Sequence, residues 1–249
     1  MFEPLKLRIL QGDPIIHDVR NAKLPKLFRG LPKIDKKACP NGCSICQEAC
    51  PTSAIGLNPV SIDLGLCVFC PICQEVCPEK IIIFSNEYCM GTDKRNELNV
   101  TSDIKSITPE KASKQIISYF GKSLKLRQIS AGGCNGCELE LNALSNVNFD
   151  MGRYGVEFVA SPRHADGILI TGPITQNMSK PIEICYEAVP KPKIIILYGA
   201  CAISGGTFQN STNIERKFLK DNNIDLFIPG CPPHPLTFIN AILGWLDKK

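Results

Sequence analysis

Cysteines are the residues whose number and spacing point most directly to chemistry in this sequence. The chain has 14 cysteines, and twelve of them fall into three sets of four. The first set is Cys39, Cys43, Cys46 and Cys50, the second is Cys67, Cys70, Cys73 and Cys77, and the third is Cys134, Cys137, Cys201 and Cys231. Four thiolates are the ligands that one [4Fe–4S] cluster needs. The sequence therefore predicts three [4Fe–4S] clusters and a role in carrying single electrons.

The first two sets are near copies of each other. The segment CQEACP at 46–51 returns as CQEVCP at 73–78. In ferredoxins with two clusters, a C-x2-C-x2-C turn supplies three ligands, and the cysteine before the proline binds the other cluster. On that pattern one cluster takes Cys39, Cys43, Cys46 and Cys77, and the other takes Cys67, Cys70, Cys73 and Cys50.

The first set departs from the pattern, because three residues separate Cys39 from Cys43. Gly42 could accommodate the extra residue by adopting a positive φ. A [3Fe–4S] cluster that does not use Cys39 is one alternative here. Zinc is another, since it also binds C-x2-C pairs, but zinc has no use for the repeated Cys-Pro ligand.

The net charge says little about partners. The formal charge of +4 describes the chain without clusters. Each [4Fe–4S]2+ cluster with four thiolates carries about −2, so three clusters would bring the total to about −2. No run of Lys and Arg with interleaved aromatic residues is present, and we expect no nucleic-acid partner.

The sequence also bears on location. It shows neither a signal peptide nor an apolar run of about 18 residues, which a membrane-spanning helix needs. We therefore expect reduced cysteines in the cytoplasm, and attachment to a membrane only through partner subunits.

The chain divides into segments of different character. We expect an N-terminal extension at 1–30, either solvated or packed on a partner, and a ferredoxin-like domain with two [4Fe–4S] clusters at 31–90. A linker at 91–122 contains a helix predicted from Thr108 to Tyr119, with Pro109 in its first turn. Residues 123–249 form the second domain.

The second domain alternates apolar strands with amphipathic helices. The expected strands are Leu124–Ser130, Val156–Ala160, Gly167–Thr171, Lys193–Tyr198 and Ile224–Ile228. The expected helices are Glu138–Leu144, Lys180–Val189, Asn213–Leu219 and Pro235–Leu246. This alternation predicts an α/β fold with a flavodoxin-like parallel sheet covered on both faces. The third cysteine set lies just after three of the strands, so its members should converge at the carboxyl edge of the sheet.

Five ordered motifs surround the third set. They are AGGCNGCELE (131–140), SPRHAD (161–166), ITGPIT (170–175), YGACAISGG (198–206) and PGCPPHP (229–235). Together they resemble the small subunit of [NiFe] hydrogenases, most closely the membrane-bound group that includes formate hydrogenlyase and energy-converting hydrogenases. They also resemble the related quinone-site subunit of respiratory complex I. Residues 27–90 look like the separate two-cluster ferredoxin subunit of the same complexes.

The resemblance implies a function and a set of partners. Cys134, Cys137, Cys201 and Cys231 would hold the proximal [4Fe–4S] cluster, and no catalytic residue would lie in this chain. The nickel–iron site would belong to a large subunit, with membrane-arm subunits and an external electron donor or acceptor protein as further partners. The complex would lie at the cytoplasmic side of the cell membrane. Two alternatives are a nickel-free, complex I-like oxidoreductase and a soluble ferredoxin-type carrier. Complex I subunits typically have adjacent cysteines at the Cys134–Cys137 position, so the spacing here favours hydrogenase.

Several neighbours of the third set could tune or serve its cluster. Backbone N–H groups of seven glycines could approach the cluster sulfurs, although these glycines could equally just form turns. They are Gly132, Gly133, Gly136, Gly199, Gly205, Gly206 and Gly230. Arg163 and His164 are expected on the edge that holds the cluster, where a cation would stabilise the reduced state; a structural salt bridge is the alternative. Glu138 could relay protons or simply place a favourable charge at a helix N-terminus.

The remaining candidate side chains have no companions in the sequence. His17 and His234 lack neighbouring ligands, so we interpret both as structural. Cys89 and Cys185 are expected to be small buried apolar side chains.

Overall fold

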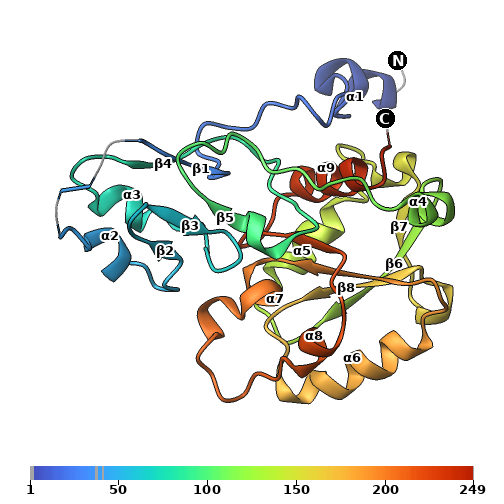
Figure 1. Ribbon diagram of the computed structural model, residues 1–249. Coiled ribbons are helices and arrows are strands. Elements are labelled where there is room, and N and C mark those ends of the chain that lie inside the picture. The colour runs from blue at the N-terminus through green and yellow to red at the C-terminus, as the bar shows by residue number, and fades with distance from the viewer. Residues whose placement is uncertain (1–2, 37–38, 41, 249) are drawn as a thin grey trace.

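The carboxyl-terminal half of the chain folds around one parallel sheet (Figure 1). The computed structural model describes residues 3–36, 39–40 and 42–248. The strands of this sheet are β6 (Leu124–Ser130), β7 (Val156–Phe158), β8 (Gly167–Thr171), β9 (Ile194–Tyr198) and β10 (Leu226–Ile228). They lie in the order β10-β9-β8-β6-β7, and each neighbouring pair is parallel. Numbered from β6, this is the flavodoxin-like order 2-1-3-4-5, so the predicted fold class is confirmed.

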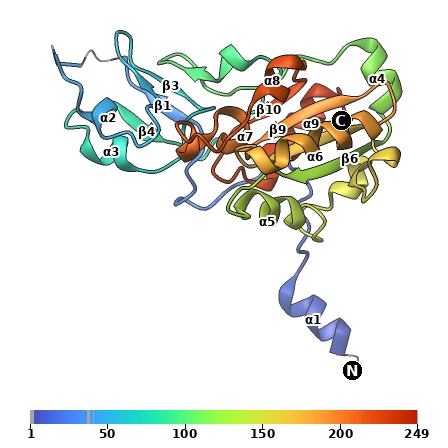
Figure 2. The same ribbon diagram turned by 90° about the horizontal axis from the view of Figure 1, so that it is seen from below.

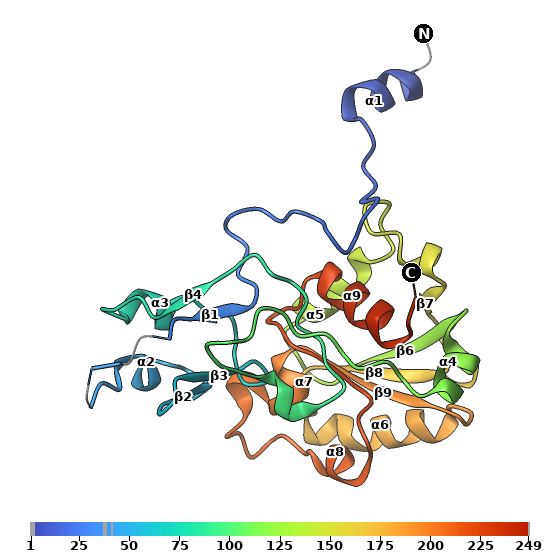
Figure 3. The ribbon, with the colours of Figure 1, turned by 45° about the horizontal axis from the view of Figure 1, so that its top comes forward.

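Helices cover both faces of the sheet. Their bounds are α5 (Gly136–Ala143), α6 (Gln176–Ala188), α7 (Ala200–Ser204), α8 (Lys217–Asp221) and α9 (Pro235–Trp245). Helices α5 and α9 lie on one face and α6 and α8 on the other (Figures 1 and 3). Short 3-10 turns complete this half at Met151–Tyr154, Pro162–His164 and Gly206–Phe208.

Two apolar clusters attach these helices to the sheet. All residues of β8 and β9 are buried, as expected for strands covered on both faces. The first cluster includes Leu126, Ile196, Leu141 and Phe238, and the second includes Ile170, Leu197, Ile182 and Phe218. Burial of each such side chain contributes about 1.5–3 kcal/mol, so the two clusters stabilise the sheet that carries the third cysteine set.

Helix α8 begins later than predicted. The expected helix at 213–219 begins only at Lys217, and the residues before it are not helical. The backbone carbonyl of Asn213 accepts a hydrogen bond from Gln176 N–H at 2.9 Å, and Ile214 forms a β-bridge with Thr175. These contacts with the start of α6 use backbone groups that a helix would need.

The helix before the sheet also starts late. Helix α4 spans Lys114–Phe120 and is capped by Ser113, whose hydroxyl oxygen accepts from Ile116 N–H at 3.3 Å. The expected start near Pro109 is wrong because Ala112 N–H donates to the carbonyl of Trp245 at 2.8 Å, which holds that stretch extended along α9.

The N-terminal half contains two small sheets and the repeated cysteine segments. Strands β1 (Pro32–Ile34) and β4 (Ile82–Phe84) form an antiparallel pair. Strands β2 (Ile55–Gly56), β3 (Ser61–Asp63) and β5 (Asn99–Val100) form the second sheet, and a 3-10 turn spans Arg95–Leu98. Each copy of the repeat makes a short helix, α2 (Ile45–Glu48) and α3 (Ile72–Val76), and these two helices contact each other.

The segment expected as a linker at 91–122 takes part in both halves. Strand β5 pairs with β3, while Thr92 forms a β-bridge with Phe227 of β10. Residues 91–100 therefore tie the small sheet to the large one.

Helix α1 (Glu3–Gln11) projects away from the rest of the molecule (Figures 2 and 3). None of its residues is buried, and Leu5, Ile9 and Leu10 are exposed. Within the described residues, the structure has no helix with the length and apolar character that a bilayer crossing requires.

Candidate iron–sulfur sites

The structure brings Cys77 to the first three cysteines. Cys39, Cys43, Cys46 and Cys77 line one small cavity between α2 and the turn that follows α3. Burial raises the pKa of the Cys46 thiol, and the neighbouring Cys39 and Cys77 raise it further. The grouping matches the exchange of fourth ligands assigned from the repeat.

The extra residue of the first set lies in a tight turn. Gly42 has a φ of +77°, in the left-handed region where glycine is favoured, and Cys43 N–H donates to the carbonyl of Pro40 at 3.0 Å. Asn41 lies outside the described residues. This turn allows Cys39 to line the cavity despite the longer spacing.

Cys50 lies with the second set. Cys50, Cys67, Cys70 and Cys73 line a second small cavity. Burial raises the pKa of Cys67 to about 12, and the charges of Cys73 and Cys50 add to the shift. Burial likewise raises the pKa of Cys73 to about 11, with Cys70 and Cys50 as the next causes.

Backbone N–H groups point at three sulfurs of these two sets. Ala54 donates to Cys50 Sγ at 3.3 Å, and Ile81 donates to Cys77 Sγ at 3.4 Å. Each donor follows its cysteine by four residues, so the repeat reproduces the contact. A third bond joins Phe69 N–H to Cys67 Sγ at 3.3 Å. Hydrogen bonds to ligand sulfurs are among the features that set cluster potentials.

The third set gathers at the carboxyl edge of the large sheet. Cys134 and Cys137 follow β6, Cys201 lies in α7 directly after β9, and Cys231 follows β10. Burial raises the pKa of Cys137, and the charges of Glu138, Cys201, Cys231 and Cys134 raise it further. Parallel strands end at a common edge, which is why residues far apart in sequence share one site.

Two glycines permit close approach of backbone to sulfur at this edge. Gly199 has a φ of +93°, and a methyl group there would lie 2.7 Å from Cys137 Sγ. Gly206 has a φ of +54°, and a methyl group there would lie 2.8 Å from Cys201 Sγ. Larger residues at either position would displace a thiol.

The other predicted glycines serve the backbone of the site. Gly136 begins α5, and a methyl group there would lie an ordinary 3.6 Å from Cys134 Sγ. Gly133 packs on Gly172, and Gly230 packs on Pro233, whose backbone a methyl group at position 230 would overlap. These contacts shape the loops that carry the cysteines.

Glu138 lies beside Cys137 in the first turn of α5. Its side chain is buried, and its Oε1 accepts a hydrogen bond from Thr171 Oγ1 at 2.5 Å. This position fits a charge at the helix N-terminus, and it also places a carboxylate next to the residue Cys137.

The expectation that Arg163 and His164 lie on the edge holding the third set is wrong. Asp166 exchanges two hydrogen bonds of 2.7 Å with the backbone of Lys125, near the start of β6. The 3-10 turn that carries Arg163 and His164 therefore lies toward the other end of β6 from Cys134, and both side chains are exposed. The chain turns back early because β7 stops after three residues.

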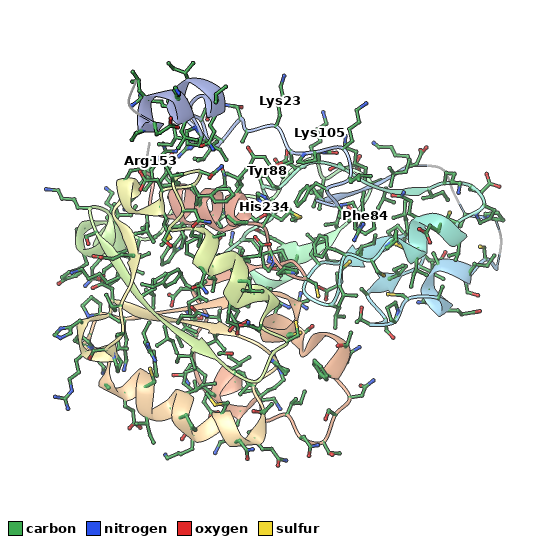
Figure 4. The ribbon with its side chains drawn as sticks, turned by 180° about the vertical axis from the view of Figure 1, so that it is seen from behind. Lys23, Phe84, Tyr88, Lys105, Arg153 and His234 are labelled. Atoms are coloured by element: carbon green, nitrogen blue, oxygen red, sulfur yellow. The ribbon has the colours of Figure 1, made fainter. Side chains whose placement is uncertain are left out.

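Tyr198 and His234 support the loop that carries Cys231. The Tyr198 hydroxyl donates to the carbonyl of Pro233 at 2.6 Å. His234, labelled in Figure 4, caps α9: its Nδ1 accepts from Leu236 N–H at 3.1 Å. Burial lowers the pKa of His234, so its ring is neutral and structural, as its isolation in the sequence suggested.

Arg216 is the residue at this site that sequence reasoning missed. Its guanidinium donates to the carbonyls of Pro173 at 3.2 Å and Cys201 at 3.3 Å, and to those of Ala202 and Ile203 at 2.8 Å. No motif marks it, because Arg216 precedes α8 and reaches back to α7 only in the folded chain.

The three sets form a row. Helices α2 and α3, which carry the first and second sets, contact each other, so these two sets adjoin. Ser204 of α7, the helix that carries Cys201, donates a hydrogen bond to the carbonyl of Gly65 just before Cys67, so the second and third sets adjoin. The second set therefore lies between the other two.

The donor groups fit iron–sulfur clusters. Each site offers four thiols, and two of the sites add N–H groups aimed at sulfur. Among the residues described, no three His, Cys, Asp or Glu side chains lie close enough to surround a single metal ion. A [4Fe–4S] cluster holds its four thiolates around a larger body.

The fold and these sites define an iron–sulfur subunit of the oxidoreductase class. Residues 134–245 match the family described as NADH ubiquinone oxidoreductase, 20 Kd subunit. A probable membrane-bound hydrogenase subunit of Pyrococcus furiosus is 37% identical over 139 residues, which are 56% of this chain and 83% of that protein. The chain therefore belongs to this family.

Two further proteins are similar to parts of this chain. Formate hydrogenlyase subunit 7 of Escherichia coli is 40% identical over 147 residues, 58% of this chain, and the match covers 57% of that protein. Among solved structures, a chain of the membrane-bound sulfane sulfur reductase, an archaeal respiratory membrane complex, is 31% identical with a TM-score of 0.46. That match covers 53% of this chain and 73% of the other.

Proposed function

We propose that this chain is the electron-transfer subunit of a membrane-associated [NiFe] hydrogenase complex that resembles formate hydrogenlyase. The two residues between Cys134 and Cys137 carry this proposal, because complex I subunits typically have adjacent cysteines there. Two relatives support it: one is a probable membrane-bound hydrogenase subunit, and the other is a formate hydrogenlyase subunit. The catalytic nickel–iron site would lie in a large subunit, and the chain itself would make or break no substrate bond.

The exposed edge of the third site supports a docked large subunit. Cys134 and Cys231 are exposed, unlike Cys137 and Cys201. Leu139 of α5, two residues after Cys137, has 61% of its surface exposed. A partner that covers this edge would shield both ligands and an apolar side chain from water.

The row of cysteine sets orders the electron route. When bound, a [4Fe–4S] cluster takes up and releases one electron at a time. The third set would lie nearest the large subunit, the second set in the middle and the first set outermost. An open hollow lined by Lys36, Cys39 and Cys43 lies next to the first set, where an external donor or acceptor protein could approach.

The proposed organisation joins two modules in one chain. The ferredoxin-like module would span 31–90 and the hydrogenase-type module 123–249, connected through 91–122 and preceded by the extension 1–30. Joining them makes their contact intramolecular, which raises their effective concentration. Membrane-arm subunits would hold the complex at the cytoplasmic side of the membrane.

Metal content of the native complex tests this function. The complex would be isolated anaerobically through a tag on this chain and analysed for nickel, iron and zinc. We expect about one nickel per chain and more than the roughly 12 iron atoms of three clusters. An intact complex that is loaded with iron but free of nickel would contradict the hydrogenase assignment.

A nickel-free, complex I-like oxidoreductase is the second candidate. The match of residues 134–245 to the 20 Kd subunit family favours it, because that family takes its name from NADH ubiquinone oxidoreductase. The same metal analysis separates the two, since both require iron and only the hydrogenase requires nickel.

A further inference from the structure

Arg216 is a partly buried cation with no acidic partner among the residues that the structure describes. Burial and the nearby guanidinium of Arg95 lower its pKa. No ion pair among the described residues includes Arg216, whereas Arg95 is bound by Asp63 through bonds of 2.9 and 2.8 Å. A guanidinium stays charged in proteins, and withdrawing a charge from water is costly unless an opposite charge compensates it.

The hydrogen bonds of Arg216 compensate this charge only in part. Three of its four carbonyl partners belong to Cys201, Ala202 and Ile203, at the end of α7. The C-terminus of a helix carries a partial negative charge of about half a unit at most, and α7 has only five residues. Cys201 also belongs to the third cysteine set, so Arg216 donates to the backbone of a residue whose thiolate would carry negative charge in a cluster.

We propose that Arg216 is the counter-charge of the third cluster and raises the reduction potential of that cluster. The proposal rests on the proposed function, in which Cys201 is a cluster ligand. A thiolate-bound [4Fe–4S] cluster gains a further negative charge on reduction. A fixed cation therefore stabilises the reduced state more than the oxidised state, and its effect is larger away from water.

The location of Arg216 suits this role better than that of Arg163. Arg163 is exposed, near the start of β6, where solvent screens its charge. Arg216 is held by four backbone carbonyls, one of which belongs to Cys201 of the third site.

The test is the reduction potential of the third cluster in the intact complex. Redox titration followed by electron paramagnetic resonance would be applied to the signal that Cys231→Ala removes. The variants are Arg216→Gln, which removes the charge, and Arg216→Lys, which keeps it with fewer carbonyl bonds. Arg163→Gln is the matched control. Thermal unfolding of each variant measures separately how far the carbonyl hydrogen bonds of Arg216 stabilise the fold.

We expect Arg216→Gln to weaken reduction of the third cluster at least tenfold, a shift of about 59 mV to more negative potential. Arg216→Lys should remain near the wild-type potential even though its unfolding temperature falls, and Arg163→Gln should change neither. If Arg216→Gln fails to load the cluster, a loaded Arg216→Lys variant at the wild-type potential still supports the role of charge.

Two results would overturn this inference while leaving the proposed function intact. One is an unchanged potential in Arg216→Gln with the cluster present, and the other is loss of the cluster in both Arg216 variants, which would make the carbonyl bonds rather than the charge essential. A wild-type complex without a signal sensitive to Cys231→Ala would instead contradict the proposed function.

Discussion

Ser204 donates its hydroxyl hydrogen to the carbonyl oxygen of Gly65 at 2.6 Å, and this bond joins the two halves of the molecule. Gly65 lies two residues before Cys67, and Ser204 lies three residues after Cys201. Gln209 adds a second bond, from its Nε2 to the carbonyl of Thr52 at 2.9 Å. The loops that carry the second and third cysteine sets are therefore bonded to each other.

Ser204→Ala should destabilise the iron-loaded chain by about 1 kcal/mol, because the carbonyl of Gly65 loses its donor. The free energy of unfolding in denaturant measures this. Ser118→Ala is the control: Ser118 donates to Gln115 within α4, and its removal should change stability by less than about 0.5 kcal/mol. Equal effects of the two substitutions would show that the bond to Gly65 contributes no more to the free energy of unfolding than the bond within α4.

Gly199→Ala should abolish the third cluster. A methyl group would lie 2.7 Å from Cys137 Sγ, and the φ of +93° disfavours alanine. Iron should fall from about 12 to about 8 atoms per chain. Gly136→Ala is the matched control, because its methyl group would lie 3.6 Å from Cys134 Sγ and should leave iron unchanged. Full iron in Gly199→Ala would mean that the thiol can move away at little cost.

Cys50→Ala should remove the cluster of the second set. Cys50 lines the same cavity as Cys73, whereas Cys46 lines the other one. The paramagnetic resonance spectrum of reduced Cys50→Ala should therefore match that of Cys73→Ala and differ from that of Cys46→Ala. A match to Cys46→Ala would show that each motif keeps its own fourth ligand.

Cys89 should make the folded chain less stable at alkaline pH. Burial first, and then the carboxylate of Glu87, raise its pKa from 9.0 to about 12. Between these values the unfolded chain releases a proton that the folded chain retains, so stability falls as pH rises above about 9. Cys89→Ala should lose less unfolding free energy between pH 8 and pH 10, by about 1.4 kcal/mol at most. Parallel losses in the two proteins would contradict the shift.

Strands were predictable both where an apolar run is buried on both faces, as in β8, and where apolar and polar residues alternate, as at the start of β6. The predicted bounds of β6 and β8 agree with the structure at both ends, since the sequence changes character sharply there. Helix starts were harder to predict where hydrogen bonds to distant backbone groups keep a segment from becoming helical. The predicted starts at Pro109 and Asn213 were wrong because Trp245 and Gln176 bond those segments across the fold.

The cysteine sets were visible in the sequence because a repeated spacing and strand ends mark them. Charges near the third set were not. Arg163 stands in a conspicuous motif but lies toward the far end of β6, whereas Arg216 reaches α7 from a segment without any motif. Spacing along the chain predicts ligands held by one loop, while the surrounding charges depend on how loops fold back.

Under the proposed function, the unequal exposure of the third site would set an order for cluster assembly. Cys134 and Cys231 are open to solvent, and the proposed large subunit would cover them. An assembly protein that delivers iron and sulfide therefore has access only before the subunits meet. Docking onto an unloaded chain would seal in an incomplete centre, so under the proposed function this site would be loaded first and the subunits joined afterwards.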